Sequence, residues 1–142
     1  MRILCIDYGD RRIGVAVCDE LGLTAQGLAT IVRKDMKSDL DAIGAYIDEY
    51  HIEEIVVGYP VMLDGTEGVQ CEKVNRFVRT LQSRFSLSVS TWDESLSTKE
   101  AERILIEANM SRKKRKQVVD KLAAVIILQG YLDYRGSVKN GE

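Results

Sequence analysis

Residues 1–14 read MRILCIDYGDRRIG, an apolar run that ends in an aspartate and a polar, glycine-containing turn. The run predicts a buried strand, and a second apolar run over residues 13–18 predicts that the two form an antiparallel hairpin. Alternation places Asp7 at the end of the first strand, on the same face as Ile3 and Cys5. A carboxylate in line with a buried face is costly unless a positive group or hydrogen-bond donors meet it. Asp7 is therefore either a metal ligand or the acid of a structural turn.

The composition is that of an ordinary globular protein without a strong overall charge. The 142 residues are 45% hydrophobic and 30% charged, and we expect a single domain spanning residues 1–142. The net charge is −2, so any binding of nucleic acid must come from a local basic patch. Cys5, Cys18 and Cys71 lack metal-ligand spacing, which predicts buried free thiols in a reducing cytoplasm. The first residues leave no room for a signal peptide and no apolar run could span a bilayer, so we expect no membrane partner.

The apolar periodicity predicts an α/β fold with one mixed, five-stranded sheet flanked by helices. The expected strands cover residues 3–6, 13–18, 23–32, 55–58 and 87–92. Four helices are expected. The first begins at a cap at Ser38, and the second carries an apolar stripe over residues 74–85. The third begins at a capping box at 97–100, and the fourth runs from about residue 116 to 134. The first three strands are antiparallel, and the later strands, each preceded by a helix, add to the same sheet in parallel.

Three acidic residues fall at the ends of these predicted elements. Asp7 ends the first strand, Glu94 follows the last strand, and Asp120 lies near the start of the last helix. Carboxyl ends of parallel strands gather at one sheet edge, and Asp120 shares a helical face with inward-packing apolar residues, so the three acids can converge. Converging carboxylates are the ligands that Mg²⁺ or Mn²⁺ requires. His51, the single histidine, is expected to be solvated and to take no part in the site. Taken singly, each acid is better explained as a turn or helix-start residue.

Four short blocks of sequence, spread over nearly the whole chain, form a specific set. They are DYGDRRIGVA at residues 7–16, GYP and DGTEG within 58–68, WDESLST at 92–98, and DKLAA at 120–124. In this order they resemble the D-x-G-x-x-R-x-G-x-A, G-L-P…D-G-T-E-G, D-E-R-L-[ST]-T and D-x-x-A-A blocks of the YqgF family, the Holliday-junction-resolvase-like or pre-16S rRNA nucleases. The resemblance implies an RNase H-like fold and an acidic cluster formed by Asp7, Glu94 and Asp120.

The chain departs from the family pattern at two positions. Tyr59 stands where the family has Leu, and Ser95 stands where it has Arg. The missing Arg favours an alternative in which the chain is a non-catalytic nucleic-acid-binding factor with the same fold. Asp93 competes with Glu94 for the metal-facing position, because strand periodicity alone does not choose between neighbouring residues.

We interpret the chain as a metal-dependent nuclease. Two Mg²⁺ or Mn²⁺ ions held by Asp7, Glu94 and Asp120 would bind the scissile phosphate, one activating water and the other stabilising the leaving oxygen. The resemblance implies precursor rRNA as the partner and maturation of the 5′ end of 16S rRNA as the role, with Holliday-junction or other branched DNA as the alternative. The phosphate loops of ATP-binding domains of the actin and sugar-kinase class also begin D-x-G after a first strand. Such enzymes carry two similar domains, however, and this chain has no repeat. The sequence leaves monomer and homodimer open.

One dense basic block and one of the arginines in the first hairpin are the candidates for binding phosphate. These residues are Arg12, Arg112, Lys113, Lys114, Arg115 and Lys116. The block is ordinarily explained as a solvated loop between helices, and Arg12 is equally placed to pair with an acid in the hairpin. Their closeness to the proposed acids predicts instead that they bind the phosphates flanking a cleavage site.

Overall fold

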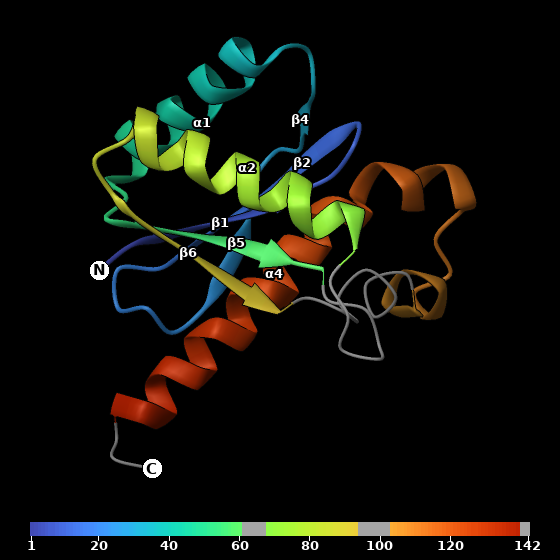
Figure 1. The fold of residues 1–142 in the computed structure, drawn as a ribbon. Coiled ribbons are helices and arrows are strands. Elements are labelled where there is room, and N and C mark those ends of the chain that lie inside the picture. Colours follow the sequence, from blue (N-terminus) through green and yellow to red (C-terminus); the bar gives the residue numbers. More distant parts are fainter. Residues whose placement is uncertain (61–67, 94–102, 140–142) are drawn as a thin grey trace.

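The computed structural model describes residues 1–60, 68–93 and 103–139, which form a mixed sheet with helices on both faces (Figure 1). The strands are β1 (Ile3–Tyr8), β2 (Arg12–Cys18), β3 (Ala25–Gly27), β4 (Ile31–Val32), β5 (Glu54–Tyr59) and β6 (Ser88–Asp93). The helices are α1 (Met36–Tyr50), α2 (Val69–Arg84) and α4 (Arg112–Lys139), and residues 103–107 are also helical. Within these ranges, no helix has the length and apolar character needed to cross a membrane.

The sheet confirms the predicted combination of an antiparallel hairpin with parallel additions. Its strand order is β3-β2-β1-β5-β6, and β4 pairs with β2 outside this path. β1 runs antiparallel to β2 and parallel to β5, which in turn runs parallel to β6. β1, β5 and β6 therefore end at the same edge of the sheet, and α4 begins on that side of the molecule (Figure 1). We call this edge the carboxyl edge.

The prediction of one continuous third strand over residues 23–32 is wrong, because the segment forms the two short strands β3 and β4. Both pair with β2, with Gly27 opposite Ala16 and Ile31 opposite Ile13. The outer segment takes four steps between these pairs (27 to 31) and β2 takes three (16 to 13), so one residue is extra. An extra residue interrupts the ladder as it does in a β-bulge. The sheet consequently has six strands rather than five.

Helix α1 begins before the cap that the sequence predicts. The side chain of Asp35 accepts the backbone N–H of Ser38 at 2.8 Å, so Asp35 is the N-cap and Ser38 lies inside the helix. The same hydrogen bond lowers the pKa of the Asp35 carboxyl. At the other end His51 closes the helix in a left-handed conformation, with its backbone N–H bonded to Ile47. His51 is exposed, as predicted.

Helix α4 also begins earlier than predicted, at Arg112 instead of near residue 116. The hydroxyl of Ser111 accepts the backbone N–H of Lys114 at 3.3 Å, which is the contact made by an N-cap residue. The basic block is therefore the first part of the helix, and its interpretation as a loop is wrong.

The two faces of the sheet are covered by different helices (Figure 1). The face under α1 and α2 buries Leu4, Ile6, Val15, Ile43, Phe77 and Leu81. The face under α4, which we call the α4 face, buries Ile3, Cys5, Ala16, Val56, Ala124, Ile127 and Leu128. Ala123 and Ala124 are completely buried, so the small side chains let α4 approach the sheet closely, as predicted. These contacts fix the position of the helix segment that carries Asp120.

Candidate active site

Asp7 is a buried carboxylate near the end of the central strand. It belongs to β1, which lies between β2 and β5, and it is only 8% exposed. Its alternation partners Ile3 and Cys5 both pack under α4. Asp7 therefore lies on the α4 face at the carboxyl edge, which confirms the face predicted from the sequence.

The turn that follows Asp7 is too tight for a side chain at Gly9. The backbone N–H of Gly9 donates to the carbonyl oxygen of Arg12 at 3.0 Å. A Cβ atom at Gly9 would lie 2.6 Å from the same oxygen, a distance that real Cβ contacts do not reach. The aspartate-x-glycine pattern thus combines a buried acid with the one residue that closes the hairpin directly behind it.

A residue that sequence reasoning missed, Arg33, holds this turn from the segment between β4 and α1. Its Nη1 atom donates to the carbonyl oxygens of Gly9 at 3.0 Å and Asp10 at 3.2 Å. Its guanidinium lies 4.5 Å above the ring of Tyr8, which stacks on Phe77 with a centroid distance of 4.0 Å. The residue directly after Asp7 is thereby clamped between a cation and an aromatic ring.

The charge of Arg33 is balanced by Asp39, a carboxylate in α1 that is only 3% exposed. The two groups are 3.8 Å apart, and Asp39 also accepts the backbone N–H of Lys34 at 3.1 Å. A buried carboxylate requires such partners. The available signal was an acid beside the inward-facing residues Leu40 and Ile43 of α1, but nothing local in the sequence links it to the hairpin turn. We call Arg33, Asp39 and Tyr8 the turn clamp.

Helix α2 contacts the same turn from another side. The Nζ atom of Lys73 lies 3.1 Å from Asp10, and Gln70 donates to the carbonyl oxygen of Tyr8 at 3.2 Å. Asp10 is largely exposed, so this ion pair adds little stability. The turn nevertheless has contacts from α2 and from the segment before α1, and these restrict where the end of β1 can lie.

The sequence offers two neighbouring acids at the end of β6, Asp93 and Glu94, and the structure describes the first of them. Trp92 packs against the α4-face cluster, so the next residue, Asp93, lies on the opposite face by alternation. Asp93 is paired with Tyr59, which packs against the core under α1 and α2. Asp93 and Asp7 therefore lie on opposite faces of the sheet. Glu94 lies outside the described residues.

Asp120 lies in α4, one helical turn before Ala124, which packs against the sheet. Its side chain is outside the described part of the structure. Within the described part, no group of three or more His, Cys, Asp or Glu residues is placed to hold a metal ion. The convergence of Asp7, Glu94 and Asp120 therefore stays a prediction, supported by the position of Asp7 and by the course of α4.

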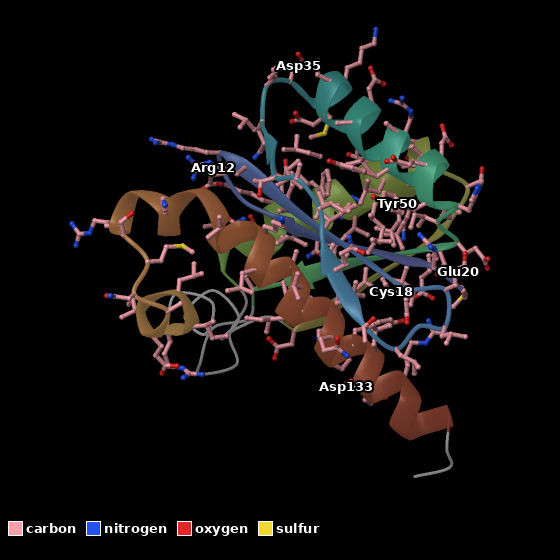
Figure 2. All side chains as sticks on the ribbon, turned by 180° about the vertical axis from the view of Figure 1, so that it is seen from behind. Arg12, Cys18, Glu20, Asp35, Tyr50 and Asp133 are labelled. Carbon is pink, nitrogen blue, oxygen red and sulfur yellow. The ribbon has the colours of Figure 1, made fainter. Side chains whose placement is uncertain are left out.

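The basic residues lie toward the same end of the molecule. Arg12 opens β2, opposite Val32 of β4, and Figure 2 shows it at the end of the molecule where α4 begins. Arg112 and Lys114 are exposed in the first turns of α4, which contain no acidic residue. Positive charge at a helix N-terminus opposes the helix dipole and is mildly destabilising. Such a block is unfavourable for the helix itself, which favours a role in binding anions.

Comparison with known proteins confirms the family resemblance. Residues 1–134 match the family model described as RuvX: Holliday junction resolvase. A protein of Syntrophus aciditrophicus named "Putative pre-16S rRNA nuclease" is 56% identical over 133 residues, covering 94% of this chain and 89% of that protein. A protein of Halothermothrix orenii with the same name is 56% identical over 138 residues, covering 97% of this chain and 99% of that protein.

Solved structures confirm the fold class. Fowlpox virus resolvase, in a complex with Holliday junction DNA, matches with a TM-score of 0.58 and 12% identity, covering 94% of this chain and 98% of that one. T. thermophilus RuvC, also with a Holliday junction substrate, matches with a TM-score of 0.52 and 16% identity, covering 95% of each chain. At these identities the likeness shows the fold alone, which is the predicted RNase H-like arrangement.

Removing the charge of Arg33 tests whether the turn clamp stabilises the fold. In Arg33→Met the apolar stem over Tyr8 remains, but Asp39 loses its cation and two carbonyl oxygens lose a donor. We expect the free energy of unfolding to fall by about 1–3 kcal/mol, the usual cost of leaving buried polar groups unsatisfied. Urea denaturation measures the change.

Arg84→Met is the matched control. Arg84 also pairs with an aspartate, Asp41, and lies over an aromatic ring, Phe85, but this pair is 42% and 54% exposed. We expect it to lose less than about 1 kcal/mol, as exposed pairs do. Equal losses in the two variants would contradict a special role for the clamp.

Replacing Lys113 and Lys114 with Ala tests the basic block. Binding of nucleic acid should weaken for all sequences, and the slope of log affinity against log salt should fall by roughly 1 to 2 units, about 0.7–0.9 for each lost phosphate contact. Fluorescence anisotropy at several salt concentrations measures the slope. Lys34→Ala with Lys37→Ala, which alters two exposed lysines around the start of α1, is the control and should leave the slope unchanged. Equal slopes for all three proteins would assign the block to solvent.

Proposed function

Because the chain belongs to the RuvX family of Holliday junction resolvases, we propose that it is a metal-dependent nuclease with Asp7, Glu94 and Asp120 as its catalytic acids. The observation that carries the proposal is the placement of Asp7. A carboxylate that is 8% exposed lies one residue before the end of the central strand, on the face that α4 covers with the stripe leading to Asp120. This arrangement supports a site at the carboxyl edge of the sheet.

The donor atoms at this edge fit Mg²⁺ or Mn²⁺, which prefer carboxylate oxygens. The three cysteines are free and buried, as predicted. The sulfur of Cys18 is held by Met1 and Ile3 at the other end of the hairpin strands, and Cys71 donates to the carbonyl oxygen of Pro60. When bound, such ions polarise the phosphodiester and lower the pKa of water.

The protein itself supplies position and charge. The closed turn at Gly9 and the turn clamp fix the end of β1, so Asp7 keeps one place relative to the sheet. The basic block at the start of α4 would hold the phosphates on either side of the scissile bond. His51 is unsuited to act as a general base here, because it caps α1 beside Tyr50, which Figure 2 shows at the opposite end of the molecule from Arg12.

The substrate that the relatives support best is the precursor of 16S rRNA, and we propose hydrolysis near its mature 5′ end, in the cytoplasm. Branched DNA is the second candidate, because the family model is described as a Holliday junction resolvase. Cleavage assays with Mg²⁺ or Mn²⁺ on a 16S leader RNA, a linear duplex and a four-way DNA junction separate the two. Binding without cleavage on every substrate would favour the non-catalytic alternative that Ser95 raises.

Asp7→Asn tests the metal site, because it keeps the shape of the side chain and removes its charge. If the three acids converge, the metal-free variant loses a like-charge repulsion and should be at least as stable as the parent. Excess Mn²⁺ should stabilise the parent by mass action, about 2.7 kcal/mol at one hundred times the dissociation constant, and the variant much less. Thermal melts with EDTA and with Mn²⁺ measure both effects, and cleavage should be lost together with the metal-dependent shift.

Asp10→Asn is the control for this experiment. Asp10 belongs to the same turn but is 68% exposed and paired with Lys73, so its loss should leave the Mn²⁺ shift as large as in the parent. A metal-free Asp7→Asn that is destabilised by about 1 kcal/mol, with an undiminished Mn²⁺ shift, would make Asp7 a structural turn residue instead.

A further inference from the structure

Trp92 lies in the same row of the sheet as Asp7. In the parallel register Ile6 is opposite Val57, so the next residues, Asp7 and Gly58, are level with each other. Gly58 is in turn opposite Trp92 of β6. The row at the carboxyl edge therefore runs from the proposed catalytic acid, across a residue without a side chain, to the single tryptophan of the chain.

The two side chains also share a face. Trp92 packs with the α4-face cluster, the side on which alternation places Asp7. Neighbouring strands lie about 4.8 Å apart, so the two positions, which are two strand spacings apart across β5, are separated by about 10 Å. No side chain of β5 stands between them in this row, because position 58 is glycine. A nucleotide whose phosphate is held at Asp7 can direct its base toward Trp92.

The indole of Trp92 is held in a fixed orientation by α4. Tyr131 contacts it edge-on at a centroid distance of 5.5 Å, and Tyr134 lies at 5.1 Å in a tilted arrangement. Gly130 lies against the same ring, since a Cβ there would be in van der Waals contact with the indole nitrogen at 3.5 Å. Tyr131 is itself anchored, because its hydroxyl donates to Glu54 at 2.6 Å. Tyr131 and Tyr134 thus hold the indole ring in place, and the anchor of Tyr131, Glu54, lies at the other end of β5 from Gly58.

The aromatic group packs against the α4-face cluster and also reaches the surface. Trp92 is half-buried and Tyr134 is 55% exposed, and β6 is the last strand of the sheet on this side among the described residues. A rigid, partly exposed aromatic ring beside a phosphate site is the feature on which unpaired bases stack.

We propose that Trp92 stacks on the base of a nucleotide next to the phosphate held at Asp7. The inference rests on the proposed nuclease function and adds the form of its substrate: the strand is unpaired, or its base is turned out of the helix, at that nucleotide. Stacking is tolerant of sequence, because every base presents a flat face. The site therefore selects an accessible base and leaves the choice of sequence to other contacts.

Two probes of equal length isolate this contact. One is a uridylate decamer, and the other is a decamer of abasic units with the same phosphates and no bases. Anisotropy titrations of the full chain, with Ca²⁺ present, give an affinity ratio of uridylate to abasic probe. Stacking on one base is worth about 5- to 150-fold in affinity, so Trp92→Leu should lower this ratio by a factor in that range and leave binding of the abasic probe unchanged.

Two variants keep the test decisive. Trp92→Phe retains a ring, so it should keep most of the preference for uridylate. If Trp92→Leu unfolds, quenching of the Trp92 emission of the parent by uridylate but not by the abasic probe decides the test. Tyr46→Leu removes an aromatic residue of α1, on the other side of the sheet, and should behave like the parent. An equal affinity ratio in the parent, Trp92→Leu and Trp92→Phe would overturn the stacking proposal, as would a parent that does not prefer uridylate.

Failure of this proposal can be distinguished from failure of the proposed function. If the parent cleaves RNA with Mn²⁺ but its affinity ratio ignores Trp92, the chain is a nuclease and Trp92 is structural. If the ratio depends on Trp92 but no substrate is cleaved, the stacking site stands and the catalytic assignment falls. Quenching of the single tryptophan by uridylate, absent with the abasic probe, gives an independent readout of the same contact.

Discussion

The parallel pairing of β1 with β5 is the constraint on which the candidate site depends. A slip of one residue would move every side chain of β1 to the other face, which would place Asp7 in the core under α1 and α2. The pairing is held at its first step, where Ile3 lies opposite Glu54. Glu54 accepts hydrogen bonds from Tyr131 and Arg135 of α4, at 2.6 and 3.3 Å. The helix that carries Asp120 thereby also pins the register of the strand that carries Asp7.

The parts of the site that the sequence predicts are those with a short-range pattern. Alternation over Ile3, Cys5 and Asp7 needs only one strand, and it gives the correct face. The alanines after Asp120 indicate a close helix contact by their size alone, and both are buried. The family resemblance then supplies the acids as a set. Whether Glu94 and Asp120 meet Asp7 is not tested by the described residues, so this step remains where the sequence left it.

The parts that the sequence does not predict depend on partners far along the chain. Arg33 contacts the turn at Gly9, a residue 24 positions earlier, and no periodicity connects them. The break between β3 and β4 follows from the register with β2, which a single-segment pattern does not contain. The cap Ser111 is followed by a run of basic residues, so a search for apolar periodicity starts α4 too late. Asp35 is distinguished from Ser38 as the cap of α1 only by the hydrogen bond between the two, which periodicity does not show.

Helix α4 joins the two halves of the proposed site through contacts made elsewhere. Its far part is tied to the sheet by Arg135, Tyr131 and Gln129, the last of which bonds the backbone of Ala25 at 3.1 Å. Asp120 is four residues, about 6 Å along the helix axis, from the buried Ala124, so these remote contacts fix its place along that axis. The first five residues of the same helix are all basic, and positive charge at a helix N-terminus opposes the helix dipole. A phosphate backbone bound beside them would offset that repulsion, whereas the free protein relies on the anchored end of the helix to keep the first turns formed.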